Sequence, residues 1–227
     1  MKTSAQIFLL TMLVLSCAAP QKSKTWKELY LESTTLTELG LYSEAAKVAE
    51  ETLTVAEKTF GPDHSNVTLS LNCLVFLYYF QGKYSEAEPL CKRALAINEK
   101  AFGKDHPRVA TDLNNLAELY RLQSRYADAE PLHKRALKIR ERALGPEHHD
   151  VAISLNNLAA VYQAQGIYSE AEPLLKRALA IAEKTLGPDH PKVATVCENM
   201  AELYRQIGKE GKAKKFEERA RRIRSNQ

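Results

Sequence analysis

A period of 42 residues, repeated without a gap, constrains the fold of this sequence more than any other feature. Four consecutive segments, 27–68, 69–110, 111–152 and 153–194, align with one another, and a fifth, 195–227, keeps their register. The recurring residues include Gly61, Gly103, Gly145 and Gly187, then Tyr42, Tyr84, Tyr126 and Tyr168, and His64, His106, His148 and His190. A unit of this size cannot bury its apolar face alone, so neighbouring units must stack. The sequence therefore predicts one repetitive architecture over residues 27–227, with no separate catalytic domain.

Each unit carries two stretches with helical periodicity. One stripe of the third unit follows i, i+3, i+4, i+7 spacing and consists of Leu113, Leu116, Ala117 and Tyr120. A second stripe, in the later half of the fourth unit, consists of Ala171, Leu174, Leu175, Ala178 and Leu179. Alanine recurs at positions 87, 129, 171 and 213, where a small side chain lets two helices approach closely. We therefore expect an all-α solenoid built from antiparallel helix pairs.

Cap and turn residues separate the predicted helices. Gly82 and Gly166 mark the turn inside a pair, and Ser124 takes this place in the third unit. The strings at 85–88 and 169–172 have the form of capping boxes, which predicts that the second helix of a pair opens there. Three carboxylates follow the glycines between units, and we expect them to cap the next helix; they are Asp63, Asp105 and Asp189.

Little in the sequence indicates chemistry at a catalytic or metal centre. Equivalent histidines of successive units must lie on the order of 10 Å apart, whereas zinc ligands lie about 2 Å from the metal. We therefore expect each histidine to bond within its own turn. No phosphate-binding glycine loop, nucleophile elbow or HExxH motif is present in the sequence. The sequence thus predicts a protein that is not an enzyme and needs no metal or cofactor.

Composition and charge agree with a soluble folded chain. The net charge is +4, too mild to predict nucleic-acid binding, and the basic run from Lys209 to Arg224 fits the solvated face of a terminal capping helix. Cys197 replaces a leucine of the repeat and is expected in the core. A disulfide between Cys73 and Cys91 stays open as an alternative if the chain is exported.

The N-terminal residues differ from the repeats. An apolar run from Ile7 to Leu15 is too short to cross a bilayer and is typical of a signal peptide over residues 1–16, followed by a short tether over 17–26. The string Val14-Leu15-Ser16-Cys17 resembles the lipobox of bacterial lipoproteins, which implies lipid attachment at Cys17 and a membrane-anchored protein facing the periplasm or the cell exterior. The alternative is ordinary cleavage after Ala18, which gives a soluble secreted protein.

The repeats themselves resemble a known family. The strings 113–120, 126–137 and 145–148 are similar to the 42-residue tetratricopeptide repeats of kinesin light chains, and the likeness covers nearly all of 27–227. The resemblance implies a right-handed solenoid whose first helices line a concave groove. The heptad segment by which a light chain joins its motor is absent from this sequence, so no motor role is implied.

Carried over by position, the resemblance assigns the groove a set of amide, aromatic and charged residues. The predicted partner-binding residues are Asn72, Phe76, Tyr79, Asn114, Asn115, Glu118, Arg121, Asn156, Asn157, Asn199, Glu202 and Arg205. Amide side chains carry donors and acceptors together, which suits an extended peptide backbone, while aromatic side chains suit an apolar anchor. Alternatively, some of the asparagines bond neighbouring helices, and Phe80 belongs to the core. The sequence predicts a scaffold or adaptor for a protein or peptide partner; the alternative is a solenoid that binds a small molecule or glycan.

Overall fold

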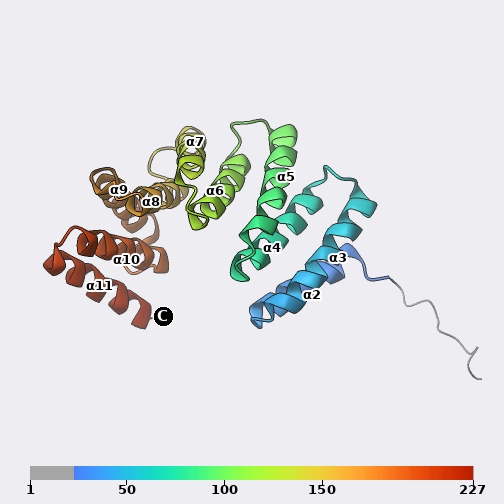
Figure 1. Ribbon diagram of the computed structural model, residues 1–227, viewed down its shortest axis with the longest axis horizontal. Coiled ribbons are helices and arrows are strands. Elements are labelled where there is room, and N and C mark those ends of the chain that lie inside the picture. Colours follow the sequence, from blue (N-terminus) through green and yellow to red (C-terminus); the bar gives the residue numbers. More distant parts are fainter. Residues whose placement is uncertain (1–22, 227) are drawn as a thin grey trace, which may run out of the picture.

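The structure is a computed structural model that describes residues 23–226. Over this range every regular element is a helix. In chain order they are α2 (Trp26–Glu38), α3 (Tyr42–Phe60), α4 (Ser65–Phe80), α5 (Tyr84–Phe102), α6 (Pro107–Leu122), α7 (Tyr126–Leu144), α8 (His149–Ala164), α9 (Tyr168–Leu186), α10 (Pro191–Gln206) and α11 (Glu210–Ser225). Figure 1 shows them as successive pairs along an arc, with α2 and α3 at one end and α10 and α11 at the other. The predicted all-α solenoid is confirmed.

The packing of the helices defines an inner face. The two helices of a pair pack together, and each second helix also packs against the first helix of the next pair. First helices approach one another directly at three junctions, α2–α4, α6–α8 and α8–α10. Helices α4 and α6 are joined mainly through α5, which packs against both.

The turn inside each pair needs a left-handed backbone conformation. Gly82 and Gly166 supply it, with φ angles of 70° and 75°. In the third pair the same place is taken by Ser124 at φ 59°, the one non-glycine residue with positive φ among those described. The period therefore fixes the backbone of this turn even where the glycine is missing.

Histidines, and not aspartates, begin the first helices. His64, His106, His148 and His190 are the N-cap residues, and each Nδ1 accepts the backbone N–H two residues later at 3.1–3.2 Å. The expectation that each histidine bonds within its own turn is confirmed, and the assignment of Asp63, Asp105 and Asp189 as caps is wrong. The aspartates lie one residue too early, because the cap position is set by where the helical backbone starts.

The proposed capping boxes are also wrong. Helices α5 and α9 begin at Tyr84 and Tyr168, so Ser85 and Ser169 already lie inside the helix and make no cap hydrogen bond. A capping box does occur once, where Thr25 and Glu28 open α2.

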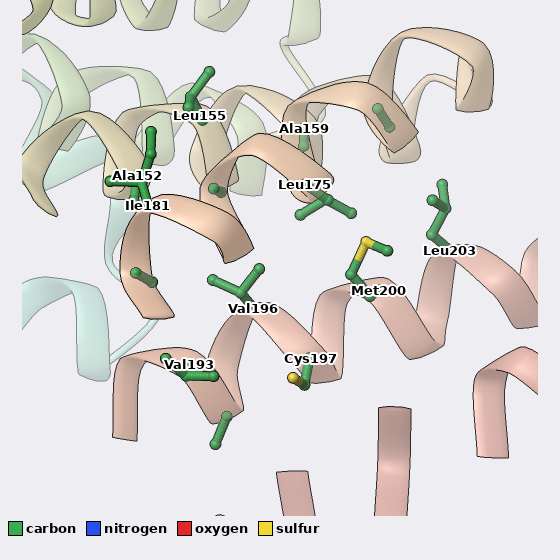
Figure 2. Close-up of a cluster of buried hydrophobic side chains, with 14 of the residues drawn as sticks. Ala152, Leu155, Ala159, Leu175, Ile181, Val193, Val196, Cys197, Met200 and Leu203 are labelled. Carbon is green, nitrogen blue, oxygen red and sulfur yellow. The ribbon is translucent and has the colours of Figure 1, made fainter. Parts of the chain in front are cut away.

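The core consists of columns of equivalent residues 42 positions apart. Leu29, Leu71, Leu113 and Leu155 are fully buried, and Cys197 ends this column, also fully buried, as predicted. Figure 2 shows the end of this column, Leu155 and Cys197, within a cluster of buried side chains that also includes Leu175 of α9 and Met200 of α10. Cys73, Cys91 and Cys197 are free thiols, so the alternative of a Cys73–Cys91 bridge is not realised in this structure.

Candidate binding groove between α4 and α6

Helix α4 presents aromatic side chains at two positions where the other first helices have no aromatic residue. Phe76 is 47% exposed and Phe80 is 49% exposed. The residues equivalent to Phe76 in α6, α8 and α10 are Glu118, Ala160 and Glu202, and those equivalent to Phe80 are Leu122, Ala164 and Gln206. The two rings are neighbours, with centroids 4.6 Å apart, and a contiguous exposed apolar patch marks an interaction site more often than single exposed residues do.

These rings form one group, which we call the aromatic cluster: Tyr42, Phe76, Tyr79 and Phe80. Phe80 is its centre, with ring centroids 4.6 Å from Phe76, 5.3 Å from Tyr79 and 5.1 Å from Tyr42. Because Tyr42 opens α3 and the others lie on α4, the cluster is held by two helices that pack against each other. The alternative that Phe80 belongs to the core is not what the structure shows, since half of its surface is exposed.

The aromatic cluster borders a cavity of about 350 Å³ between α4 and α6, here called the aromatic cavity. Its lining residues are Asn72, Val75, Phe76, Tyr79, Phe80, Asn115, Glu118 and Leu119. Five of the predicted partner-binding residues, Asn72, Phe76, Tyr79, Asn115 and Glu118, are thereby brought together. A sixth, Arg121, holds the Glu118 carboxylate through Nε and Nη2 at 2.8 and 2.7 Å. Burial raises the pKa of the Tyr79 hydroxyl, which therefore stays protonated and can donate at neutral pH.

Asn114 does not line the groove. It is only 6% exposed, its Nδ2 donates to Ser154 Oγ at 3.2 Å, and its Oδ1 lies 2.7 Å from His133 Nδ1. The assignment of Asn114 to the partner-binding set is therefore corrected, because its amide is used inside the array. Burial lowers the pKa of His133 to about 4, so the imidazole is neutral and its Nδ1–H can donate to Asn114.

The remaining predicted residues lie farther along the array. Asn156 and Asn157 line a smaller cavity of about 250 Å³ between α8 and α10, here called the apolar cavity. Asn199 Nδ2 donates to Asn156 Oδ1 at 2.8 Å, so part of the hydrogen-bonding capacity of both amides is already used between them. Glu202 and Arg205 form an exposed ion pair that also includes Glu217 of α11. The predicted set thus divides into a group at the α4–α6 junction and a group near α10.

A third cavity, of about 370 Å³, was missed by the sequence analysis. It also lies between α4 and α6, towards the start of both helices, and we call it the acidic cavity. Its lining residues are Ser65, Thr68, Leu69, Asn72, Asn98, Arg108, Thr111 and Asp112. Asn72 borders both this cavity and the aromatic cavity, so the two are neighbours. The available signal was Asp112, which stands where the first unit has Glu28 and the other units have Ser70, Ser154 and Val196.

One group of side chains has the composition of a metal site. Ligand atoms of His148, His149 and Asp150 lie within 4.8 Å of one another at the start of α8. The Nδ1 atom of His148 already accepts the Asp150 N–H as the helix cap. That bond leaves Nε2 as the ring nitrogen of His148 that is open to a metal. Among the described helices, none combines the length and the apolar composition that a membrane span requires.

Comparisons with known proteins agree with this architecture. Profiles of the tetratricopeptide repeat match residues 66–142, 113–184 and 150–226, and a second such profile matches residues 33–66. The nearly identical TPR-like repeats of a kinesin light chain candidate from Podosopora anserina are 26% identical, with 88% of this chain and 95% of that chain covered and a TM-score of 0.70. BtubC (BKLC) from P. vanneervenii is also 26% identical, with 88% and 80% covered and a TM-score of 0.73.

A more distant likeness concerns the fold alone. A Rap protein complexed with Competence and Sporulation Factor is 17% identical, with 88% of this chain and 54% of that chain covered and a TM-score of 0.75. Among curated proteins, none matches this sequence.

Proposed function

The chain belongs to the tetratricopeptide repeat family, and on that premise we propose that it is a binding scaffold whose aromatic cavity holds an apolar side chain of a partner protein or peptide. The observation that carries this proposal is the half-exposed pair Phe76 and Phe80 at the mouth of a cavity. A ring that is half exposed leaves on the order of 100 Å² to be covered, so burying both rings contributes about 2 kcal/mol each. The total of about 4 kcal/mol corresponds to a Kd on the order of 1 mM, so polar contacts at the rim must add to it.

The polar rim of the cavity suits a peptide more than an isolated apolar molecule. The amides of Asn72 and Asn115 stand on opposite sides, one on α4 and one on α6, and each offers a donor and an acceptor. A backbone in extended conformation presents both kinds of group in alternation. Glu118 is paired with Arg121, so the rim carries no isolated charge that would repel an apolar anchor.

The related folds give this proposal its background. The Rap protein was solved complexed with Competence and Sporulation Factor, so a solenoid of this shape accommodates a partner in that protein. We propose a non-catalytic role for the present chain, with a protein or peptide and not a nucleic acid as its partner. Turnover of a substrate above the rate in a buffer control, abolished by substitutions in the groove, would contradict the non-catalytic role.

The groove proposal can be tested with the full chain and a displayed library of random 12-residue peptides. We expect the selected peptides to be rich in aromatic and aliphatic residues and to bind the double variant Phe76→Ala/Phe80→Ala at least tenfold more weakly. Ile167→Ala is the matched control, because Ile167 is 39% exposed but lies in the turn before α9. Equal binding to the double variant and the unchanged chain would show that the groove assignment is wrong.

We also propose, from the sequence alone, that the scaffold is tethered to a membrane through lipid at Cys17. Cys17 and the predicted signal peptide lie outside the described residues. Labelled fatty acid should be incorporated into the expressed chain and lost in a Cys17→Ser variant. Fatty-acid incorporation that persists in the Cys17→Ser variant would contradict the lipid tether without affecting the groove proposal. A secreted soluble protein would then remain as the alternative.

A further inference from the structure

A buried carboxylate without a cation lies at the floor of the acidic cavity. Asp112 is 2% exposed and is the one buried acidic residue in the described part of the chain. Its Oδ2 accepts from Asn98 Nδ2 at 2.6 Å, and the amide of Asn72 also bonds the carboxylate. Both partners are neutral, although buried carboxylates are normally paired with a cation or a metal. The structure alone therefore gives no reason for a charge at this position.

An unpartnered hydroxyl lies in the same cavity. Thr68 is 6% exposed, and its Oγ1 has no hydrogen-bond partner. Elsewhere in the array hydroxyls on helices are satisfied by the carbonyl four residues earlier, as in Thr52 to Val48 at 2.7 Å and Ser70 to Asn66 at 2.9 Å. Buried polar atoms that lack a partner are uncommon in folded proteins. Asp112 and Thr68, from facing helices, thus line one cavity with polar atoms that a ligand would satisfy.

The basic residue nearest to Asp112 in the sequence of α6 does not pair with its carboxylate. Arg108 lies one turn before Asp112 on α6, but its guanidinium stacks over the Phe102 ring at 4.7 Å from the centroid. Arg108 is exposed and stands at the rim of the cavity. The carboxylate therefore remains available from the groove side.

We propose that the acidic cavity binds a basic side chain, lysine or arginine, of the same peptide whose apolar side chain occupies the aromatic cavity. The inference rests on the proposed groove function and adds a specificity to it. N–H groups of an ammonium or guanidinium ion donate to the Asp112 carboxylate and to Thr68 Oγ1, which supplies the charge and the partner that the two groups lack. Bidentate pairing favours arginine.

The spacing of the two cavities sets the spacing of the two side chains. Thr68 and Phe76 are eight residues apart on α4, which is about 12 Å along the helix axis. An extended chain covers about 3.3–3.6 Å per residue, so the apolar and the basic residue should be three or four positions apart.

The apolar cavity between α8 and α10 is a control built into the molecule. It is lined by Ala152, Ile153, Asn156, Ala182 and Val196, the positions equivalent to Thr68, Leu69, Asn72, Asn98 and Asp112. The array therefore builds this cavity without Asp112, Asn98 or Thr68. The polar set at the α4–α6 junction is a departure from the repeat and not a requirement of the fold.

The charge state of Asp112 gives the binding a pH dependence. Burial raises the pKa of this carboxyl to about 6, against the hydrogen bonds from Asn98 and Asn72, which lower it. The charged groups near it are Glu99 on α5 and Arg108 on α6, and Cys91 on α5 is a neutral thiol whose pKa burial raises to about 12. Arg140 of α7 reaches the cavity edge through Thr111. Because a cation needs the ionised carboxylate, its binding should weaken as pH falls through about 6.

The test uses the full chain and sets of fluorescent peptides that share a fixed phenylalanine. One further position, three or four residues before or after it, carries arginine, lysine, citrulline or glutamate, and the other positions are randomised. Fluorescence anisotropy at pH 7.5 should show the arginine and lysine sets binding about tenfold more tightly than the citrulline set. At pH 5 the preference should shrink to about twofold.

Two variants connect this preference to the cavity. Asp112→Ser installs the residue found at positions 70 and 154, and should abolish the preference while binding to the citrulline set is unchanged and the Tm is not lowered. Thr68→Val keeps the shape of the side chain and should reduce the preference by about threefold at an unchanged Tm.

Each contrary outcome has a distinct meaning. Equal binding of the arginine and citrulline sets overturns the inference and leaves the groove proposal standing. Unfolding of the Asp112→Ser chain also overturns it, because the carboxylate would then serve the fold. If no set binds with a dependence on Phe76 and Phe80, the groove proposal fails as well.

Discussion

The α4–α6 and α8–α10 junctions have the same backbone plan and opposite chemistry. At the first, Asn98 and Asp112 meet under the groove; at the second, Ala182 and Val196 occupy the same two positions. A repeat array can thus change the character of one junction by a few side chains while its neighbours keep the fold, because each unit contacts only the next.

The junction between them, α6–α8, holds a third combination. Here Arg140 and Ser154 take the two positions, and Arg140 is 6% exposed. Its Nη1 donates to the Asp150 carbonyl and to Ser154 Oγ, both at 3.0 Å, and its Nη2 donates to Thr111 Oγ1 at 3.3 Å. The buried charges of both junctions have neutral hydrogen-bond partners, but at α4–α6 the hydroxyl of Thr68 has no partner at all.

The largest effect should come from Arg140→Ala, which installs the residue found at the equivalent position 182 of the α8–α10 junction. Loss of three hydrogen bonds and of a buried side chain should lower the free energy of unfolding by about 3 kcal/mol. Urea denaturation followed by circular dichroism measures it. A change below about 1 kcal/mol would mean that this junction, like the α8–α10 junction with its alanine, does not need a guanidinium for stability.

The next effect should come from Asp112→Ser, with the opposite sign. The folded pKa of about 6 is raised above the unfolded value of about 3.9, so the folded state binds the proton more tightly and is relatively stabilised below pH 4. That advantage is lost as pH rises from about 4 to 6, which leaves an ionised carboxylate in the interior. Allowing for the two amides left behind, Asp112→Ser should raise stability at pH 7.5 by about 2 kcal/mol.

The same comparison at pH 4 provides the control for this prediction. There the carboxyl is protonated in the folded chain, so the gain from Asp112→Ser should nearly vanish. A gain that is equal at both pH values would show that packing, and not charge, separates the two junctions.

A smaller effect concerns the column of asparagines at 72, 114 and 156. Asn114→Ala leaves His133 Nδ1 without a partner and Ser154 Oγ with Arg140 alone, and should lower the free energy of unfolding by about 1.5 kcal/mol. Asn156→Ala, whose bond to Asn199 lies in a half-buried position, should lower it by less than about 0.5 kcal/mol. Thermal unfolding of the two variants in parallel distinguishes a structural from a groove asparagine, and equal shifts would contradict the assignment.

An effect below that of Asn114→Ala should come from the turn in the third pair. Ser124→Gly places the glycine of the neighbouring turns at a φ of 59° and should raise stability by about 0.5–1 kcal/mol. Gly166→Ser is the reciprocal control and should lower stability by a similar amount. No change in either variant would mean that the local backbone relaxes at no cost.

The comparison also explains which features the sequence could predict. The helix pairs, the left-handed turns and the buried leucine column follow from the period, because 42-residue recurrence makes each unit a check on the others. The helix caps could not be placed from the period, since aspartate and histidine both recur and only the exact start of the helical backbone decides between them.

The sequence pattern also could not predict the direction in which each groove side chain points. Asn72, Asn114 and Asn156 are equivalent by position, but Asn114 alone faces a histidine, His133, where the other units have Cys91 and Leu175. That pairing depends on a side chain from another helix. Asp112 was visible as a break in its column, but its meaning required the cavity around it.

The position of two cavities at the α4–α6 junction has a mechanical consequence. Because pairs contact only their neighbours, α2–α5 on one side and α6–α11 on the other can behave as two arms joined at this step. A rotation of a few degrees there is multiplied by the length of the arms. A ligand that binds between α4 and α6 and changes their angle would therefore change the distance between the two ends of the arc. That distance would report binding at a site far from either end.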